Sequence, residues 1–515
     1  MSESYHFIGI GGIGMSGLAA MCRDLGGRVT GSDRGAERPE NRRILDALEL
    51  QGITIFPQDG SFIHSGERPD YLVYSTAIEE DNPDFAAGTG IPRLHRSELL
   101  ASILSTGRFK NTIAVTGSCG KSTVTAYTAE ALTNLGADPC CLNGALSKRF
   151  RGGRFAGNYR AGGNEYFVFE ADESDKSLLN YTVDYAVILN IGTDHYDREE
   201  LARVFAGFLQ RVRRGAVIER GVYEAIGEAA IPAGLKIAVF DAEPRGGTRY
   251  ALAGYNMETR LEMVYRYGRR SPVRPGADRD EYDREGANNI LAIQGLRSEE
   301  FRIERRVPTA EFTDGRRVEL PHSGLHMAIN ALAITALLDM LGFDFQAIPE
   351  ALERFDGVWR RNDFAGTTRQ GALVYDDYAH NPEKIISCLR AMRELASGNL
   401  YAVFQPHGYG PFGFMRDELF IRLDSELRAL DRFILLEPYY AGGTTSFRPT
   451  APEVLADWQS RSRRPERFMF FPDRETLRDF LLLKCGSGDL IVTMGARDNS
   501  LSDYAASLTE PVNAG

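Results

Sequence analysis

The sequence predicts an α/β protein of three consecutive domains: N-terminal Rossmann-like, central P-loop ATPase-like and C-terminal Rossmann-like. Three observations support this class. The length of 515 residues corresponds to roughly three domains of about 150 residues each. Short apolar strands alternate with helical stretches in three successive blocks, and two of these blocks open on a glycine-rich turn. We expect the domains to span residues 1–107, 108–355 and 356–515.

The first block opens with the apolar strand YHFIGI, which runs into a glycine-rich turn and then a helix. Further strands are predicted at RVTGSD, ITIF and YLVYST, with helical stretches between them. This alternation indicates a parallel sheet with crossover helices. The turn IGGIGMSG resembles a dinucleotide-binding fingerprint, but one such fingerprint is weak evidence for a nicotinamide or flavin cofactor.

The second block opens with the strand NTIAVTG, followed by TGSCGKST and a helix. Two apolar strands follow, EYFVFEAD and YAVILNIG. The segment AEFTDGRRVEL predicts a hairpin on an Asp-Gly turn, and a helix over 327–342 is expected to return to the core. The arginine-rich stretch 265–320 is most simply a solvated insertion, and a partner or regulatory surface is the alternative.

The third block follows DGVWRR at 356–361. Strands are predicted at ALVYDDY, LYAVFQP, RFILLEP and LIVTMG, with helices over 382–396 and 416–430. This pattern predicts a third α/β unit of the nucleotide-binding kind.

The composition excludes several classes of protein. With 43% hydrophobic and 25% charged residues, the chain has the composition of an ordinary soluble globular protein. A net charge of -11 argues against nucleic acid or an anionic membrane as the main partner. There is no apolar run of about 18 residues and no basic segment before the first apolar stretch, so a cytoplasmic location is expected. The six cysteines form no CxxC pair, which predicts reduced thiols rather than a disulfide framework or a zinc site.

The segment TGSCGKST has the strand-to-loop-to-helix setting that a phosphate site requires. Gly117 and Gly120 allow the backbone to approach an anion, and N–H groups at the helix N-terminus point toward it. Lys121 can neutralise the β- and γ-phosphates, while Ser122 or Thr123 can reach a magnesium ion. A glycine turn with a surface lysine is the alternative. The preceding strand and the two adjacent hydroxyl groups favour ATP.

Two polar side chains follow the next strands of this block. Glu170 stands at the end of a buried strand, where ligands bind in parallel α/β sheets, and His195 stands just after the following strand. A carboxylate together with a loop hydroxyl suits Mg²⁺, which prefers oxygen ligands. An imidazole is a less usual magnesium ligand, so His195 taken alone is more readily a structural or hydrogen-bonding residue.

An ordered set of motifs resembles the Mur ligase family, the ATP-dependent amino-acid-adding enzymes of peptidoglycan synthesis. The motifs run through nearly the whole chain: HFIGIGGIGMSGLA, SDR, STAIEEDNPDF, IPRLHRSELLA, TGSCGKST, EADESD, GTDHYD, HMAINALA, GVWRRNDF, DDYAHNP, FQPH and TMGARD. The shortened loop Gly-x-x-Gly-Lys-Ser/Thr is the form found in this family. The resemblance implies that ATP phosphorylates a substrate carboxylate and that an amino group attacks the acyl phosphate, giving an amide, ADP and phosphate.

The resemblance also implies residue roles. The expected catalytic residues are Lys121, Glu170, His195, Asp377 and Arg361. The expected ATP-binding residues are Gly117, Ser118, Cys119, Gly120, Lys121, Ser122, Thr123, Asn330, Arg360, Arg361 and Asp376. Magnesium is expected on Ser122, Thr123, Glu170 and His195.

The remaining roles concern the two other substrates. The UDP-sugar is expected on Gly11, Gly12, Ile13, Gly14, Ser32, Asp33, Ser75, Thr76 and Ala77. The amino acid is expected on Tyr378, His380, His407 and Arg416. The implied cofactors are ATP and Mg²⁺, and the implied substrates are UDP-N-acetylmuramate and a small amino acid. A monomer and a homodimer are both compatible with the sequence.

The resemblance is strongest to the branch that adds L-alanine to UDP-N-acetylmuramate, and the chain departs from that branch in its pockets. An arginine commonly follows FQPH there, whereas this chain has Gly408, and its nearest arginine is Arg416. Asn381 replaces a histidine of DDYAHNP, and Cys119 replaces a loop histidine or asparagine. Glycine, serine, another amino acid or a preformed peptide therefore stay open as substrates. A nicotinamide oxidoreductase or nucleotide-sugar sensor is the alternative from another class, and it gains nothing from Lys121.

Overall fold

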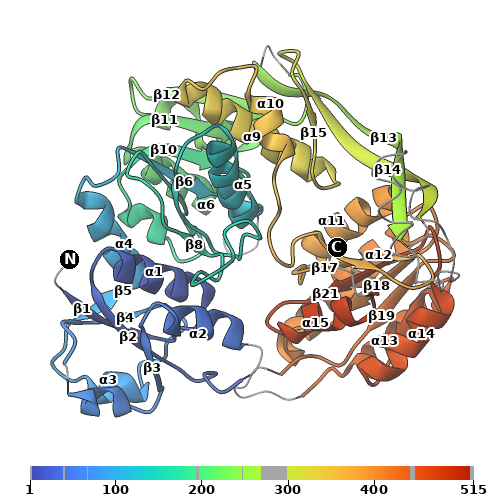
Figure 1. The fold of residues 1–515 in the computed structure, drawn as a ribbon, viewed down its shortest axis with the longest axis horizontal. Helices are drawn as coiled ribbons and strands as arrows, with labels where there is room; N and C mark the ends of the chain where they lie inside the picture. The colour runs from blue at the N-terminus through green and yellow to red at the C-terminus, as the bar shows by residue number, and fades with distance from the viewer. Residues whose placement is uncertain are drawn as a thin grey trace, which may run out of the picture.

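The computed structural model describes residues 3–38, 41–66, 68–192, 197–245, 248–267, 298–440 and 447–510, with the backbone alone over 259–267 and 298–305. Within these residues the chain forms three sheets in the order of the sequence, each flanked by helices (Figure 1). The predicted α/β class is therefore confirmed. The domain boundaries stay predictions. No helix in the described ranges is both long and apolar enough to cross a bilayer.

The first sheet is parallel and has the strand order β3-β2-β1-β4-β5. Its elements are β1 (Ser4–Ile8), α1 (Ile13–Asp24), β2 (Arg28–Asp33), α2 (Arg42–Glu49), β3 (Thr54–Pro57), β4 (Tyr71–Tyr74), α3 (Pro83–Ala87), β5 (Arg93–His95) and α4 (Arg96–Ser105). All residues of β1 are buried because strands cover both its edges and helices cover the sheet. The glycine-rich turn between β1 and α1 therefore lies at the carboxyl edge of the sheet.

The middle sheet has the order β15-β14-β13-β12-β11-β10-β6-β9-β7-β8. Its strands are β6 (Asn111–Thr116), β7 (Cys140–Leu142), β8 (Tyr159–Arg160), β9 (Tyr166–Glu170), β10 (Val183–Ile188), β11 (Val212–Glu219), β12 (Lys236–Asp241), β13 (Tyr250–Tyr267), β14 (Ser298–Phe312) and β15 (Arg317–Glu319). Its helices are α5 (Lys121–Asn134), α6 (Arg198–Leu209), α7 (Arg220–Ile226), α9 (Leu325–Leu341) and α10 (Ile348–Glu353). Helix α9 is buried along most of its length and packs in one core with α5, as its apolar sequence predicts.

A long antiparallel ribbon, β13 and β14, extends from the middle sheet toward the third (Figure 1). The predicted hairpin at Asp314-Gly315 is confirmed, because β14 and β15 pair antiparallel around it. The ribbon contacts the third unit, because the guanidinium of Arg306 on β14 donates to the carbonyl of Glu394 on α11 (Pro382–Leu395), 2.8 Å away. Much of the arginine-rich stretch, residues 268–297, lies outside the described residues, so its predicted role as a solvated insertion stays a prediction.

The third sheet has the order β16-β17-β21-β18-β19-β20, parallel except for β16. Its strands are β16 (Asp363–Thr367), β17 (Leu373–Asp377), β18 (Leu400–Phe404), β19 (Arg432–Leu435), β20 (Phe468–Phe470) and β21 (Leu490–Met494). Its helices are α11 (Pro382–Leu395), α12 (Tyr409–Glu426), α13 (Ala451–Arg461), α14 (Arg474–Lys484) and α15 (Ser500–Ser507). Helix α12 begins at Tyr409 rather than at the predicted residue 416. Pro411 lies in its first turn, where a missing backbone N–H costs nothing.

The three units differ in how their apolar cores join. One core runs from the helices of the first sheet to one face of the middle sheet, with Leu18 and Leu142 among its members. The third sheet is packed within cores of its own, built around residues such as Phe404 and Ile434. The first two units are therefore held together by burial of apolar surface.

The contacts between the middle and third units include the hydrogen bonds from Ser323 to Ala391 and from Gly324 to Glu394. Residues 354–362, the connecting segment, join α10 to β16. Separate cores permit motion of the third unit relative to the middle one.

Candidate active site

The loop Gly117–Gly120 follows β6 and is held by the segment after β10. The Cys119 backbone N–H donates to Asn190 Oδ1 at 2.8 Å, and Asn190 Nδ2 donates to the Cys119 carbonyl at 2.9 Å. The Gly192 N–H donates to Ser118 Oγ at 2.8 Å. Gly120 caps α5 with a left-handed φ of 87°, a conformation that favours glycine. These contacts hold the loop in one shape at a helix N-terminus, which is what an anion site needs.

The Lys121 ammonium group lies beside this loop. Its Nζ donates to the Gly117 carbonyl at 2.9 Å and to Glu173 Oε2 at 2.8 Å. Burial alone would lower the pKa of Lys121, but the carboxylates of Glu173, Glu170 and Asp172 outweigh it and raise the pKa above its ordinary value. The lysine therefore stays charged through the physiological pH range and faces the phosphate loop as a cation.

Oxygen donors gather at the same edge of the middle sheet. Strand β6 lies between β9 and β10, so Glu170 at the end of β9 is adjacent to the loop. The Gly144 N–H donates to Glu170 Oε2 at 3.0 Å, which orients this carboxylate. Ser122 is buried in the first turn of α5, and Thr123 lines the adjoining cavity. Hydroxyl and carboxylate oxygens fit a hard divalent cation. His195 lies outside the described residues.

A cavity of about 340 Å³ lies between the middle and third sheets. Residues from the phosphate loop, the segment after β10, α9, the connecting segment and α11 line this cavity. The residues that line it include Ser118, Cys119, Gly120, Thr123, Asn190, Met327, Asn330, Arg361, Asp377 and Lys384. The structure thus brings several of the predicted ATP-binding residues of two units to one cavity, with Asn330 Oδ1 close to the backbone of Gly120.

The arginine pair of the connecting segment is divided between two environments. Arg361 lines the cavity, and its guanidinium lies 5.1 Å from the centre of the Tyr378 ring. Asp377 lines the same cavity and accepts from the N–H groups of Asn362 and Ala379, each at 2.7 Å. Burial raises the pKa of Asp377, although Arg361 opposes this shift. Both residues can therefore contact a bound nucleotide or acyl group.

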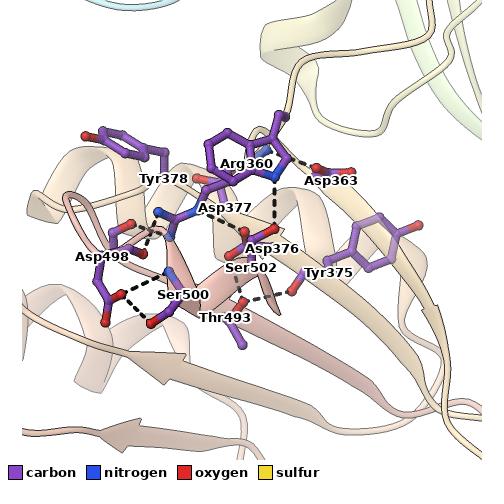
Figure 2. Close-up of polar contacts among 12 residues, drawn as sticks. Arg360, Asp363, Tyr375, Asp376, Asp377, Tyr378, Thr493, Asp498, Ser500 and Ser502 are labelled. Carbon is purple, nitrogen blue, oxygen red and sulfur yellow. Dashed lines mark hydrogen bonds and ion pairs between the residues drawn. The ribbon is translucent and has the colours of Figure 1, made fainter. Parts of the chain in front are cut away.

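Arg360 and Asp376 are instead buried inside the third unit (Figure 2). Arg360 Nε donates to Asp376 Oδ2 at 2.9 Å, and its other nitrogens donate to the carbonyls of Asp498 and Gly495 at 2.9 and 2.7 Å. Thr493 Oγ1 donates to the second oxygen of Asp376 at 2.8 Å. The expectation that Arg360 and Asp376 contact ATP is therefore corrected. Their side chains form hydrogen bonds within a buried polar network, which leaves them away from the cavity.

In the first unit, the residues predicted to bind the UDP-sugar lie at the carboxyl edge of the sheet, but Ser32 is buried. The glycine turn, Asp33 and the loop Ser75–Ala77 follow the carboxyl ends of the adjacent strands β1, β2 and β4. Asp33 accepts from the Gly11 N–H at 2.8 Å. Ser32 is completely buried, and its hydroxyl donates to Asp84, so the expected contact of Ser32 with the sugar is corrected.

A second cavity, of about 210 Å³, joins the first unit to the middle one. Gly14 of the glycine turn and Glu170 of the middle sheet both line it. The full lining is Gly14, Leu18, Arg96, Leu100, Leu142, Asn143, Gly144, Glu170, Asp172, Ser177 and Tyr181. This geometry allows a ligand held at the glycine turn to reach the expected metal site.

The residues expected to bind the amino acid are partly brought together. The rings of His380 and His407 are edge to face, 5.1 Å apart, and His380 is 5.6 Å from Tyr378. Arg416 does not join them in any contact among the described residues. It lies in the third turn of α12, beside Asp417 at 3.9 Å.

Three residues of the site escaped the sequence analysis. Glu173 pairs with Lys121, Asn190 fixes the loop, and Lys384 on α11 lines the cavity between the middle and third sheets. Glu173 belongs to the quoted motif EADESD, so its position next to Glu170 could have drawn attention to it. Asn190 and Lys384 carry no signal of their own, because their roles depend on which strands and helices become neighbours.

Three α/β units with a phosphate-type loop at the edge of the middle one are the architecture of a multidomain nucleotide-dependent enzyme. Comparison with known proteins agrees. Residues 4–108 match the family model described as "Mur ligase family, catalytic domain", residues 115–223 the "Mur ligase middle domain", and residues 360–497 the "Mur ligase, glutamate ligase domain". The chain belongs to the Mur ligase family, and it is therefore an ATP-dependent ligase, as the ordered motifs predicted.

The similarity to known proteins covers nearly the whole chain. A UDP-N-acetylmuramate–L-alanine ligase of Rhizobium meliloti (strain 1021) is 33% identical over 510 residues, covering 98% of this chain and 95% of the relative. One of Pelotomaculum thermopropionicum is 32% identical over 507 residues, covering 96% and 94%. Among solved structures, a UDP-N-acetylmuramate–alanine ligase of Thermotoga maritima has a TM-score of 0.72 at 23% identity, covering 98% of each chain. A murein peptide ligase of Psychrobacter arcticus has a TM-score of 0.61 at 21% identity, also covering 98% of each chain.

Proposed function

We propose that this ligase forms an amide bond between the carboxylate of UDP-N-acetylmuramate and the amino group of L-alanine, using ATP, in peptidoglycan precursor synthesis. One observation carries the proposal most directly. The cavity beside the phosphate loop is completed by Arg361 and Asp377 from the far side, so two units enclose the place where a triphosphate would react. The full-length similarity to proteins named UDP-N-acetylmuramate–L-alanine ligase supports the choice of substrates.

The division of labour follows the three sheets. Residues 1–107 would bind the UDP-sugar at the glycine turn, and residues 108–355 would bind ATP at the phosphate loop. Residues 356–515 would bind the amino acid and close on the nucleotide. All three substrates would meet near Lys121 and Glu170. We place the enzyme in the cytoplasm, where ATP and UDP-sugars are available.

Catalysis in this scheme rests on positioning and charge neutralisation. Lys121 would hold the β- and γ-phosphates, and its raised pKa keeps it cationic at neutral pH. Arg361 would approach the transferring phosphoryl group from the third unit. The carboxylate oxygen of the sugar acid attacks the γ-phosphorus and releases ADP. The amine nitrogen of the amino acid then attacks the acyl carbon, loses its proton and releases phosphate.

The oxygen donors at the sheet edge fit Mg²⁺. Ser122 or Thr123 would hold one ion together with the nucleotide. Glu170 and His195 would hold a second ion, and the assignment of His195 rests on the family resemblance alone. When bound, such ions supply charge neutralisation at the phosphates. Glu170 is already oriented by the Gly144 N–H, which favours one carboxylate geometry.

Phosphate release tests the proposal. Purified protein is incubated with ATP, Mg²⁺ and UDP-N-acetylmuramate against a panel of single amino acids and the tripeptide a recycling ligase would use. We expect release with L-alanine far above that with glycine or serine, and none without the UDP-sugar. Release with the peptide alone would replace this proposal by a peptide ligase. Omission of Mg²⁺ should abolish turnover.

A further inference from the structure

Three neighbouring strands of the third sheet end side by side. Strand β21 lies between β17 and β18, and its last residue, Met494, pairs with both Asp377 and Phe404. His380 and His407 each follow three residues after β17 and β18 end, and Arg497 follows three residues after β21. In parallel sheets, ligands bind at this carboxyl edge. Arg497 therefore follows the middle strand of this edge, while the histidines follow its two neighbours and contact each other, with ring centroids 5.1 Å apart.

One hydrogen bond places Arg497 beside the segment that follows β17. Its backbone N–H donates to the Tyr378 hydroxyl at 3.4 Å. Burial lowers the pKa of His407, and the positive charges of Arg497 and Lys384 lower it further. His407 Nδ1 is buried without a hydrogen-bond partner in the described part of the chain. The edge therefore combines two cations with an unsatisfied polar atom.

Gly408, which follows the FQPH motif, and Arg497 both have a positive φ. Gly408 has a φ of 100°, where side-chain-bearing residues are rarely found, so an arginine there would be strained. Arg497 has a φ of 66°, in the left-handed region that glycine adopts more easily than arginine does. The chain thus keeps a long cationic side chain where the backbone disfavours one, an outlier of the kind that clusters at ligand sites.

Arg497 is exposed, and none of the ion pairs among the described residues involves it, so its guanidinium is accessible to a ligand. Lys384, a second cation of this unit, is one of the residues that line the cavity between the middle and third sheets. Arg416, the arginine nearest to FQPH in the sequence, lies about two turns along α12 from Tyr409 and so roughly 10 Å further along the helix.

We propose that Arg497 binds the carboxylate of the incoming amino acid and thereby selects free amino acids. This inference rests on the proposed ligase function and assigns a specificity residue to it. A guanidinium binds a carboxylate through two parallel N–H···O bonds, which fixes the amino group in one direction. With Lys384 toward the nucleotide cavity, that direction would be the acyl phosphate.

The test compares L-alanine with L-alaninamide, which has the same amine but no carboxylate. Arg497→Gly suits the left-handed backbone, and Arg497→Gln replaces the guanidinium by a shorter, neutral amide. Both should raise KM for L-alanine by about 10- to 100-fold, the loss expected for a charge-assisted pair. KM for ATP and for UDP-N-acetylmuramate should change less than twofold. The preference for L-alanine over L-alaninamide should fall toward one, and Arg497→Lys should restore part of it.

Controls separate this inference from the proposed function. Arg463→Gln, at an exposed arginine of the same unit, should match the wild type. An unchanged KM for L-alanine in both Arg497 variants, or a rise with Arg416→Gln instead, overturns the assignment. Equal losses for L-alanine and L-alaninamide would reduce Arg497 to a structural role. If the wild type prefers another amino acid, the proposed function fails, and the same comparison is made with that amino acid and its amide.

Discussion

The carboxyl edges of the middle and third sheets show two ways of building one site. At the middle sheet, one contiguous motif supplies the loop glycines, Lys121 and the hydroxyls, and the structure holds them together through Asn190. At the third sheet, the edge is assembled from the ends of three strands, with Arg497 in the middle. The comparison teaches that a motif identifies a site when one loop makes it, whereas a site made by several strands depends on their order.

The largest expected effect is at the middle edge. Lys121→Ala removes the cation that would face the phosphates in the proposed site, so turnover should fall by about three orders of magnitude, comparable with other losses of transition-state electrostatics. UDP-N-acetylmuramate binding, measured by calorimetry, should stay nearly intact because its proposed site belongs to the first sheet. Equal loss of both would mean that the roles of the units have been misassigned.

The arginine pair gives the sharpest contrast at the third edge. Arg360→Gln breaks a fully buried ion pair and should lower the free energy of unfolding by about 3–5 kcal/mol. Arg361→Gln should leave the unfolding midpoint in denaturant close to that of the wild type. Its effect should instead be a roughly 100-fold loss in kcat, since Arg361 lines the nucleotide cavity. The reverse pattern would contradict the division between these neighbours.

Gly408→Arg restores the residue that commonly follows FQPH in the alanine-adding branch. At a φ of 100° the new side chain should be strained, with a cost of about 1–3 kcal/mol measured by thermal or chemical unfolding. The affinity for L-alanine should not improve. A variant that is both stable and tighter for L-alanine would return the carboxylate site to this position.

The smallest effect is expected at the loop support. Asn190→Ala removes two hydrogen bonds to Cys119 and leaves its N–H to water, so the loop should lose its fixed shape. KM for ATP should rise about tenfold, with little change in KM for the UDP-sugar. Steady-state kinetics with each substrate varied in turn would measure both. An unchanged KM for ATP would mean that the loop is held by other contacts.

Much of the fold was predictable because strands and helices alternate in three clear blocks. Helix α11 and the β14–β15 hairpin were predicted at the right places, because a proline start and an Asp-Gly turn are local signals. The start of α12 was missed because glycines and Pro411 resemble a loop, although proline is tolerated in a first helical turn.

The site was less predictable where burial decides between equivalent residues. Arg360 and Arg361 are neighbours of the same type, and only the fold shows that one is enclosed by Asp376 and two carbonyls. Ser32 was expected at an open edge, but its hydroxyl is turned to Asp84. Arg497 had no signal in its own motif. Its place follows from the insertion of β21 between β17 and β18.

A structure with a non-hydrolysable ATP analogue and Mg²⁺ tests the central claim most directly. We expect the phosphates on the backbone N–H groups of the loop 117–123, with Lys121 at the β- and γ-phosphates and Arg361 facing them from the third unit. A nucleotide bound elsewhere, or an analogue on the loop with Lys121 and Glu170 directed away from it, would contradict this account.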